Sequence, residues 1–300
     1  MLTDPPSAAL DLLVVGGLTV DRFADGTSVP GGSVLHITRA AAPRGVRVGV
    51  VTNAGPEAEA QAGLEELHQL AHVVEVTAHE ATATFRHDET PSGRTLRLER
   101  PGGSVKLASH MRDRHAPRAI LFAPIAGEVS PEALGSDRGG NGAESGGGNG
   151  ARPRGAILQG WLRSTVPGQE VEPLPLSNLP PALRAPFVAL DVIIGSREDL
   201  RAEAATPVDQ IAAMRRAFGR RPILVVTDGR DGLWIEHRGS ARPEHAAAPW
   251  LVDDVPTVGA GDVLAAFLTM NADRPPSGWQ AHVAKAMRVV AEELEARKRR

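Results

Sequence analysis

The sequence predicts an α/β fold in which the strands of a central, mostly parallel sheet alternate with helices. Short apolar runs, typical of buried strands, recur along the chain and end in loop-forming residues such as Gly, Asn and Asp. Stretches of helical character separate these runs, and this alternation is the pattern of strand–helix–strand units.

Composition excludes several classes of protein. The chain has 300 residues, 42% of them hydrophobic, with a formal net charge of −3 and no cysteine. The near-balance of charge argues against a nucleic-acid or membrane-surface partner. The lack of cysteine rules out disulfides, a thiolate nucleophile and a cysteine zinc site. No basic segment precedes the first apolar run and no apolar stretch is long enough to cross a membrane, so we expect a cytoplasmic protein without a signal peptide.

The N-terminal half supplies the first strands and helices. Expected strands lie at residues 10–15, 18–23, 46–51 and 73–77, and expected helices at 34–42 and 56–70. Proline at residue 56 suits the first turn of its helix. Asp21 and Asn53 follow buried strands, at the edge where open α/β sheets bind ligands. Asp21 is therefore either a ligand for substrate hydroxyls or an ordinary solvated acid.

A predicted hairpin projects from this half. Segments 81–86 and 95–100 alternate polar with apolar residues around Pro91-Ser92-Gly93. With residues 18–30 they are expected to form a small β lid over a site, a plain edge hairpin being the alternative. An exposed lid sheet would also allow a homodimer by edge-to-edge pairing.

The C-terminal half continues the alternation. Expected strands lie at residues 118–122, 156–159, 188–194, 222–226 and 233–236, and expected helices at 207–218 and 279–300. Residues 135–155, rich in Gly and Asn, read as a flexible insertion. Because the alternation resumes after it, we expect a single domain over 1–300. Trp161 and Arg163 follow a strand and either line a pocket or form a core Trp with an Arg at the surface.

Residues 259–262, Gly-Ala-Gly-Asp, open a helix and carry the strongest chemical signal. The small residues let an anion approach the backbone, and the unpaired amides and dipole of the helix start favour a phosphate. Asp262 is placed to accept a proton from an attacking hydroxyl, which suits phosphoryl transfer. The alternative is that Asp262 only complements the helix dipole.

Two common nucleotide-binding motifs are absent. A P-loop requires a Gly-Lys pair, and none of the three lysines follows a glycine. The first strand ends in Gly16-Gly17-Leu18-Thr19, which breaks a dinucleotide fingerprint and disfavours a dehydrogenase. Nucleotide phosphates would therefore be held by backbone amides, arginines and a metal ion.

Four segments in order resemble the ribokinase-like (PfkB) carbohydrate kinase family, and the likeness spans nearly the whole chain. They are the first strand with Gly16 and Asp21, the glycine signature Gly31-Gly32-Ser33, the T-x-G-x-x-G loop at 227–232, and the GAGD core at 259–262. The resemblance implies a ribokinase-like three-layer fold with a small β lid. It also implies an ATP- and Mg²⁺-dependent kinase acting on a hydroxyl of a sugar, polyol or nucleoside.

The resemblance also implies roles for individual residues. Asp262 would be the catalytic base, while Gly259, Ala260 and Gly261 would hold the transferring charge. The implied substrate residues are Asp21, Gly31, Gly32 and Asn53. The implied cofactor residues are Ser196, Thr227, Gly229 and Gly232, with Asp199 as the metal residue.

The chain departs from the family pattern at His36, Ser196 and Pro256. Pro256 replaces an aspartate of the C-terminal signature, which leaves open whether a monovalent cation is needed. These departures motivate an alternative function, a ligand-binding or regulatory protein that keeps the fold without the chemistry.

Overall fold

The computed structural model describes residues 9–90, 93–134, 152–179, 181–240, 242–253 and 255–299. Its centre is a nine-stranded sheet, parallel except at one edge. The parallel strands in spatial order are β5 (Val73–Ala78), β4 (Val48–Ala54), β1 (Leu12–Val15), β8 (Ala119–Phe122), β9 (Arg154–Ile157), β12 (Val192–Ser196) and β13 (Ile223–Thr227). The antiparallel edge is β14 (Leu233–Glu236) and β15 (Glu244–Ala246).

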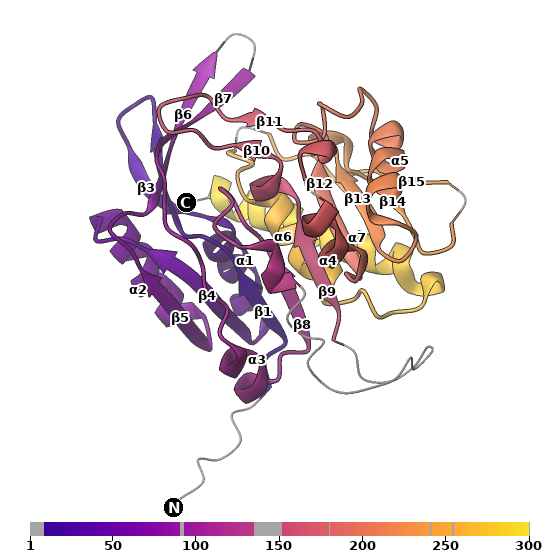
Figure 1. Cartoon of the computed structure of the whole chain (residues 1–300), viewed down its shortest axis with the longest axis horizontal. Helices are drawn as coiled ribbons and strands as arrows, with labels where there is room; N and C mark the ends of the chain where they lie inside the picture. Colours follow the sequence, from indigo (N-terminus) through magenta and orange to yellow (C-terminus); the bar gives the residue numbers. More distant parts are fainter. Residues whose placement is uncertain are drawn as a thin grey trace, which may run out of the picture.

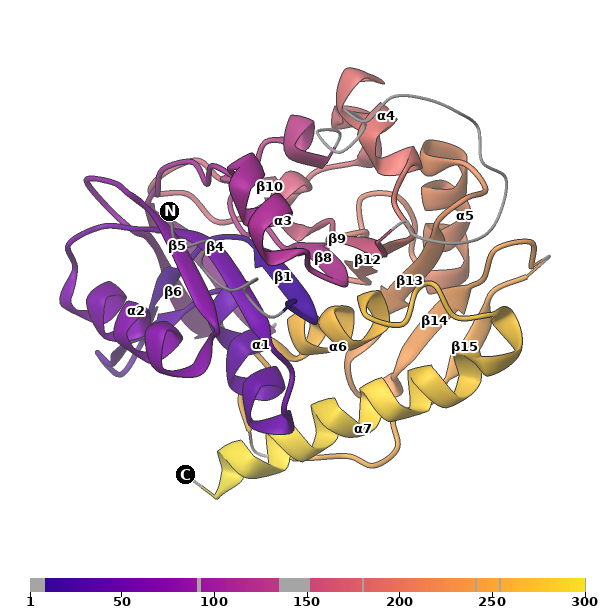
Figure 2. The same ribbon diagram turned by 90° about the horizontal axis from the view of Figure 1, so that it is seen from below.

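Helices cover both faces of this sheet and complete the predicted three layers (Figures 1 and 2). One face packs against α1 (Ser33–Ala41), α2 (Ala58–Leu70), α6 (Ala260–Thr269) and α7 (Trp279–Lys298). The other packs against α3 (Ser109–His115), α4 (Pro181–Val188) and α5 (Pro207–Phe218). No helix within the described ranges has an apolar stretch long enough to cross a bilayer.

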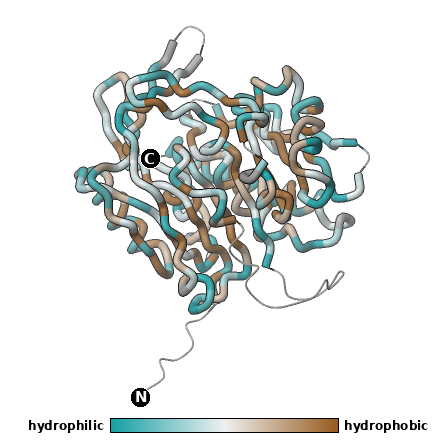
Figure 3. The backbone as a smooth tube through the Cα atoms, viewed as in Figure 1, coloured by the Kyte–Doolittle hydropathy of each residue, from teal (hydrophilic) through white to brown (hydrophobic). Residues whose placement is uncertain are grey.

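The strands read as apolar runs because both of their faces are buried. In β1, Leu12 and Val14 point into the core on the α6 side, and Leu13 and Val15 into the core on the opposite side. The apolar, brown part of the chain in Figure 3 accordingly concentrates in the central strands. The predicted α/β fold class is confirmed, and the carboxyl ends of the strands are fixed at one edge.

A separate four-stranded sheet forms from the two segments predicted to be the lid. Its strands, in spatial order, are β3 (Ser28–Gly31), β2 (Thr19–Phe23), β6 (Ala83–Thr90) and β7 (Gly93–Arg100). Strands β6 and β7 form the predicted antiparallel hairpin, and β2 pairs with β6 in parallel. Figure 1 shows this hairpin projecting from the body of the molecule.

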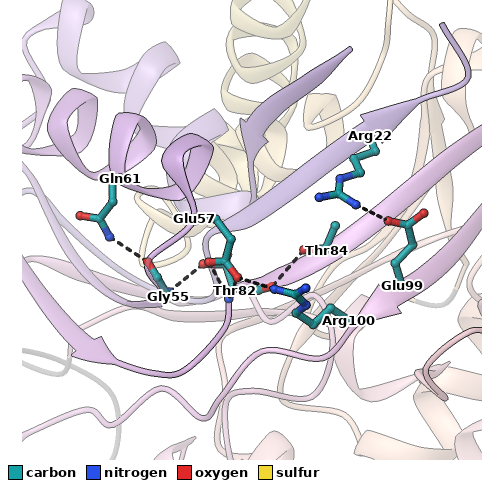
Figure 4. A network of polar contacts seen from close by, with 8 residues as sticks. All are labelled: Arg22, Gly55, Glu57, Gln61, Thr82, Thr84, Glu99 and Arg100. Atoms are coloured by element: carbon teal, nitrogen blue, oxygen red, sulfur yellow. Dashed lines mark hydrogen bonds and ion pairs between the residues drawn. The ribbon is translucent and has the colours of Figure 1, made fainter. Parts of the chain in front are cut away.

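Polar contacts at the start of α2 join the lid sheet to the body (Figure 4). Thr82, just before β6, donates its backbone N–H to the Glu57 carboxylate and accepts a 2.7 Å hydrogen bond from the backbone N–H of Gly55. Arg100, at the end of β7, pairs with Glu57 at 3.2 Å. These contacts fix the base of the hairpin at the end of the sheet that carries the site.

Two predicted boundaries are wrong. The insertion expected at 135–155 lies outside the described residues up to 151, but Arg154 and Gly155 belong to β9, where Gly155 leaves room for Thr269 of α6. The strand expected at 188–194 begins only at Val192, because 181–188 form α4. After β12, the Ser196 hydroxyl accepts a hydrogen bond from the backbone N–H of Asp199, and residues 197–203 form turns.

Candidate functional site

A cavity of about 950 Å³ lies at the carboxyl ends of the parallel strands, between the main sheet and the lid. Eleven of the thirteen residues that the sequence resemblance implied line it: Asp21, Gly32, Ser196, Asp199, Thr227, Gly229, Gly232, Gly259, Ala260, Gly261 and Asp262. Segments from both ends of the chain therefore meet in one space large enough for two small ligands.

The other two implied residues, Gly31 and Asn53, do not line this cavity. Gly31 lies behind Asp21, and a side chain there would overlap the Asp21 carboxylate and the Thr19 hydroxyl. Asn53 lines a second cavity of about 170 Å³ and donates its side-chain amide to the carbonyl of Gly103. Thr19 lines both cavities, so Asn53 lies near the substrate region without facing it.

Asp262 sits in the first turn of α6, where its largely buried side chain lines the cavity. The Ser33 hydroxyl at the start of α1 donates to its Oδ1 at 2.9 Å. Burial raises the pKa of Asp262 from 3.8 to about 6, against the lowering effects of the Ser33 hydrogen bond and the Arg163 charge. A carboxylate with a pKa slightly below neutral can act as a general base.

The start of α6 presents amides to the same space. Gly259 begins the helix with a left-handed φ of 79°, and any side chain there would overlap the ring of His36. The amide of Ala260 donates to the Thr257 carbonyl, whereas those of Gly261 and Asp262 have no acceptor among the described residues. An added Cβ on Gly261 would meet nothing within 4 Å, so open space lies beside these amides.

On the lid side, Asp21 of β2 is buried between Thr19 and His87. The Thr19 hydroxyl donates to Asp21 Oδ1 at 3.1 Å, and His87 Nε2 of β6 lies 3.5 Å from the same oxygen without hydrogen-bond geometry. The His87 ring stacks on Phe23 with centroids 5.0 Å apart. Within the described structure neither ring nitrogen of His87 has a hydrogen-bond partner.

His36 of α1 is a second histidine that lines this cavity, and its side chain is half-buried. Its Nε2 also has no hydrogen-bond partner among the described residues. Burial lowers the pKa of His36 to about 4, so the ring is neutral at physiological pH. Asp21, His36 and His87 together form a polar, buried end of the cavity, which we call the acceptor side.

The opposite end, the donor side, contains Asp199 in an ion pair. Its Oδ1 accepts from Arg163 Nε at 2.8 Å, and its Oδ2 accepts from the Ser196 hydroxyl at 2.6 Å. The terminal nitrogens of Arg163 make no hydrogen bond with the described residues. Trp161, by contrast, packs on Phe187 and donates to the Val129 carbonyl, so the Trp belongs to the core and the Arg to the site.

The loop at 227–232 and helix α7 complete the donor side. Gly232 has a φ of 100° and no room for a side chain beside the Ala246 carbonyl, so this turn requires glycine. Met287, Val290, Ala291 and Leu294 of α7 form an apolar wall. An apolar wall beside backbone amides suits a flat base joined to phosphates.

The described residues do not supply an evident direct magnesium site. No cluster of three or more His, Cys, Asp or Glu side chains among them is close enough to hold a metal ion. Both oxygens of Asp199, the implied metal residue, already accept hydrogen bonds from protein groups. The donor set therefore does not fit a magnesium ion bound directly to Asp199.

Sequence reasoning noted His36 only as a departure from a motif and passed over His87. The one available signal was spacing: Ala83, Phe85 and His87 alternate along β6 and are all buried. Alternation shows that these residues share a face, but the direction of that face depends on the pairing of β2 with β6, which is not local in sequence.

Comparison with known proteins gives matches among solved structures alone. No protein-family model and no curated protein matches the chain. A pyrophosphate-dependent kinase in the ribokinase family, complexed with a pyrophosphate analog and myo-inositol, matches with a TM-score of 0.64 and 17% identity, covering 93% of this chain and 92% of that chain. Ribokinase from Thermotoga maritima matches with a TM-score of 0.65 and 14% identity, covering 95% and 93%.

Arabidopsis thaliana ribokinase, complexed with ribose and ATP, matches with a TM-score of 0.64 and 15% identity, covering 93% of this chain and 90% of that chain. Similarity at these identities, extending over nearly the whole chain, establishes the architecture that the four sequence motifs implied. The protein is a divergent example of the ribokinase-like fold.

Proposed function

We propose that the protein is a kinase that transfers the γ-phosphoryl group of ATP to a hydroxyl of a small, uncharged sugar, polyol or nucleoside. The observation that carries the proposal is the position of Asp262. It is a buried carboxylate in the same helix turn as unpaired amides that face the cavity, between the acceptor side and the donor side.

In the proposed reaction the acceptor hydroxyl lies between Asp262 and the γ-phosphorus. Its oxygen forms a bond to phosphorus, its proton passes to Asp262, and the bond to the bridging oxygen breaks so that ADP leaves with the electron pair. The amides of Gly261 and Asp262 stabilise the charge on the transferring group. Magnesium would be bound by the phosphates of the nucleotide and would neutralise part of their charge.

The acceptor side supports an uncharged, hydroxyl-rich substrate. Asp21 accepts hydrogen bonds, Nε2 of the neutral His36 ring has no partner in the described structure, and neither has either ring nitrogen of His87. Among the described residues, no lysine lines the cavity, and three of its arginines, Arg163, Arg197 and Arg230, are paired with the donor-side carboxylates Asp199, Asp228 and Asp253. The lid sheet above this end would exclude water and limit ATP hydrolysis.

The apolar wall of α7 favours ATP over pyrophosphate as the donor, because pyrophosphate has no group to occupy it. The test is a panel of neutral sugars, inositols and nucleosides assayed with either donor, with the phosphorylated product identified by mass spectrometry. ATP-dependent product from at least one acceptor supports the proposal. Product with pyrophosphate alone would contradict the donor assignment.

A second candidate is a non-catalytic protein that binds the same ligands. It is favoured by the Arg163–Asp199 ion pair, which occupies the carboxylate expected to serve the metal. Binding of both ATP and an acceptor by calorimetry, without turnover of any acceptor in the panel, would favour this candidate.

A further inference from the structure

Arg297, in the last turn of α7, reaches back to the loop that precedes α6. Its Nη1 donates to the carbonyl of Val258 at 2.6 Å and lies 3.3 Å from that of Pro256. The neighbouring Lys298 donates to the carbonyl of Asp253 at 3.1 Å. These two side chains therefore bind the loop that leads into Gly259.

The Glu293 carboxylate lies next to the guanidinium of Arg297 and orients it. Glu293, one turn earlier in α7, places Oε1 3.7 Å from Arg297 Nε, and its side chain is only 7% exposed. Arg44, after α1, lies 3.9 Å from the other oxygen of Glu293. A buried carboxylate thus orients Arg297, whose own side chain is 19% exposed.

The positive charge of Arg297 acts on Asp262 and His36. It lowers the pKa of Asp262 and that of His36, which identifies it as one of the cations near both residues. Two carbonyl oxygens that converge on one point need a cation or a strong donor between them. Here the chain supplies that cation itself, directly before the amides at the start of α6.

We propose that Arg297 is a positioning residue: a tethered cation that holds the 256–258 loop so that the amides of α6 face the phosphoryl group. This inference rests on the proposed kinase function. It also answers the question raised by Pro256, because a fixed guanidinium at these carbonyls removes the need for a monovalent cation from solvent.

The test compares Arg297→Met with Arg299→Met, a matched control in the same turn whose side chain is 74% exposed and, among the described residues, pairs only with Glu295. Arg297→Met is expected to lower kcat about 100-fold, the order of effect of misplacing a reacting group by 1 Å, with little change in the KM of the acceptor. Arg299→Met should leave both unchanged. Added guanidinium ion should restore part of the lost rate.

Two further readouts separate positioning from stability. The acid limb of the pH profile should move to higher pH in Arg297→Met, because a cation that favours ionised Asp262 is gone. The wild-type rate should be the same in potassium, sodium or tetramethylammonium buffers. The double variant Arg297→Met/Glu293→Gln, which leaves no unpaired buried charge, should remain slow while regaining thermal stability.

Several results would overturn the inference. They are an unchanged kcat in Arg297→Met, full recovery of kcat in the double variant, and a wild-type rate that requires potassium. If the wild type turns over no acceptor, the proposed function fails separately. In that case calorimetry measures the affinity of wild type and Arg297→Met for a non-hydrolysable ATP analogue. Equal affinities would show that Arg297 does not position the anion site.

Discussion

The two sides of the cavity differ in how their polar groups are satisfied. On the acceptor side, the ring nitrogens of His87 and Nε2 of His36 have no hydrogen-bond partner in the described structure, although these atoms are buried. On the donor side, carboxylates are paired: Asp199 with Arg163 at 2.8 Å, Asp228 with Arg197 at 3.0 Å and Asp253 with Arg230 at 2.8 Å.

This difference indicates what each side is built to receive. A buried polar atom without a partner costs about 1–3 kcal/mol, so a cluster of them is tolerated where a ligand supplies the missing hydrogen bonds. Hydroxyl groups can do so as both donors and acceptors. On the donor side, each carboxylate is neutralised by an arginine, which leaves N–H donors for an anion rather than free oxygens for a metal ion.

The largest expected effect comes from Asp262, which lies between the two sides. Asp262→Asn keeps the side-chain volume and can still accept the Ser33 hydrogen bond, so the fold should be retained. Removing the base should lower kcat about 1,000-fold while leaving ATP affinity nearly unchanged. Steady-state kinetics and calorimetry measure both, and a near wild-type kcat would show that Asp262 is only a helix-start acid.

Asp21→Asn tests the acceptor side alone. It should lower kcat/KM for the acceptor about 100-fold, because a charged hydrogen bond to a substrate hydroxyl is replaced by a neutral one in a buried site. The KM for ATP should not change. Asp25→Asn is the control, since Asp25 is exposed and accepts only from Thr27. An equal rise in the KM for ATP would contradict the division into two sides.

Asp21 and Asp262 lie in short sequence motifs and can be identified from them. Other residues of the site, such as His87 and Arg297, reach it through contacts between segments that are far apart in the sequence. The positive φ angles of Gly232 and Gly259 belong to local turns, so short motifs identify these glycines and the segment at 31–33. His87 enters the site through pairing of β2 with β6, more than sixty residues apart. Arg297 reaches the loop ahead of α6 only because α6 and α7 pack together.

The same reasoning explains the fold. The alternation of strands and helices could be predicted because the sheet is buried on both faces, and its strands are therefore continuous apolar runs. Segment 181–188 was missed as a helix because it begins and continues with proline. The ion pair between Arg163 and Asp199 joins the segments that follow β9 and β12. No sequence motif links these two positions, so the pair could not be predicted.

Arg163→Met tests the donor side and should have a smaller effect. Losing one phosphate-facing guanidinium should raise the KM for ATP about tenfold, with the KM of the acceptor unchanged. Asp199→Asn should change the KM for ATP less and should leave the magnesium dependence of the rate unaltered, because Asp199 serves Arg163 rather than a metal ion. A strongly raised magnesium requirement in Asp199→Asn would restore Asp199 as the metal residue.

The smallest effect is the pH dependence at Asp262, where the two sides meet. The groups that act on it are the hydrogen-bonding Ser33, the cations Arg163 and Arg297, and the anion Asp199. With a pKa of about 6 and a base that works only when ionised, kcat/KM should be half its maximum near pH 6 and fall about tenfold per unit below it. Asp262→Asn should lose this limb.

Stability should change in the opposite sense across the same window. The pKa of Asp262 is about 6 in the folded state and 3.8 without burial, so between these values the folded protein binds more protons than the unfolded chain. Its free energy of unfolding therefore falls as pH rises from about 4 to 6, by on the order of 3 kcal/mol from this residue. Urea denaturation at pH 4 and 7 checks this. Asp262→Asn should reduce the difference in the free energy of unfolding between the two pH values. If the wild type instead became more stable than Asp262→Asn as the pH rises, the Asp262 carboxylate would be stabilised in the fold and its pKa would not be raised.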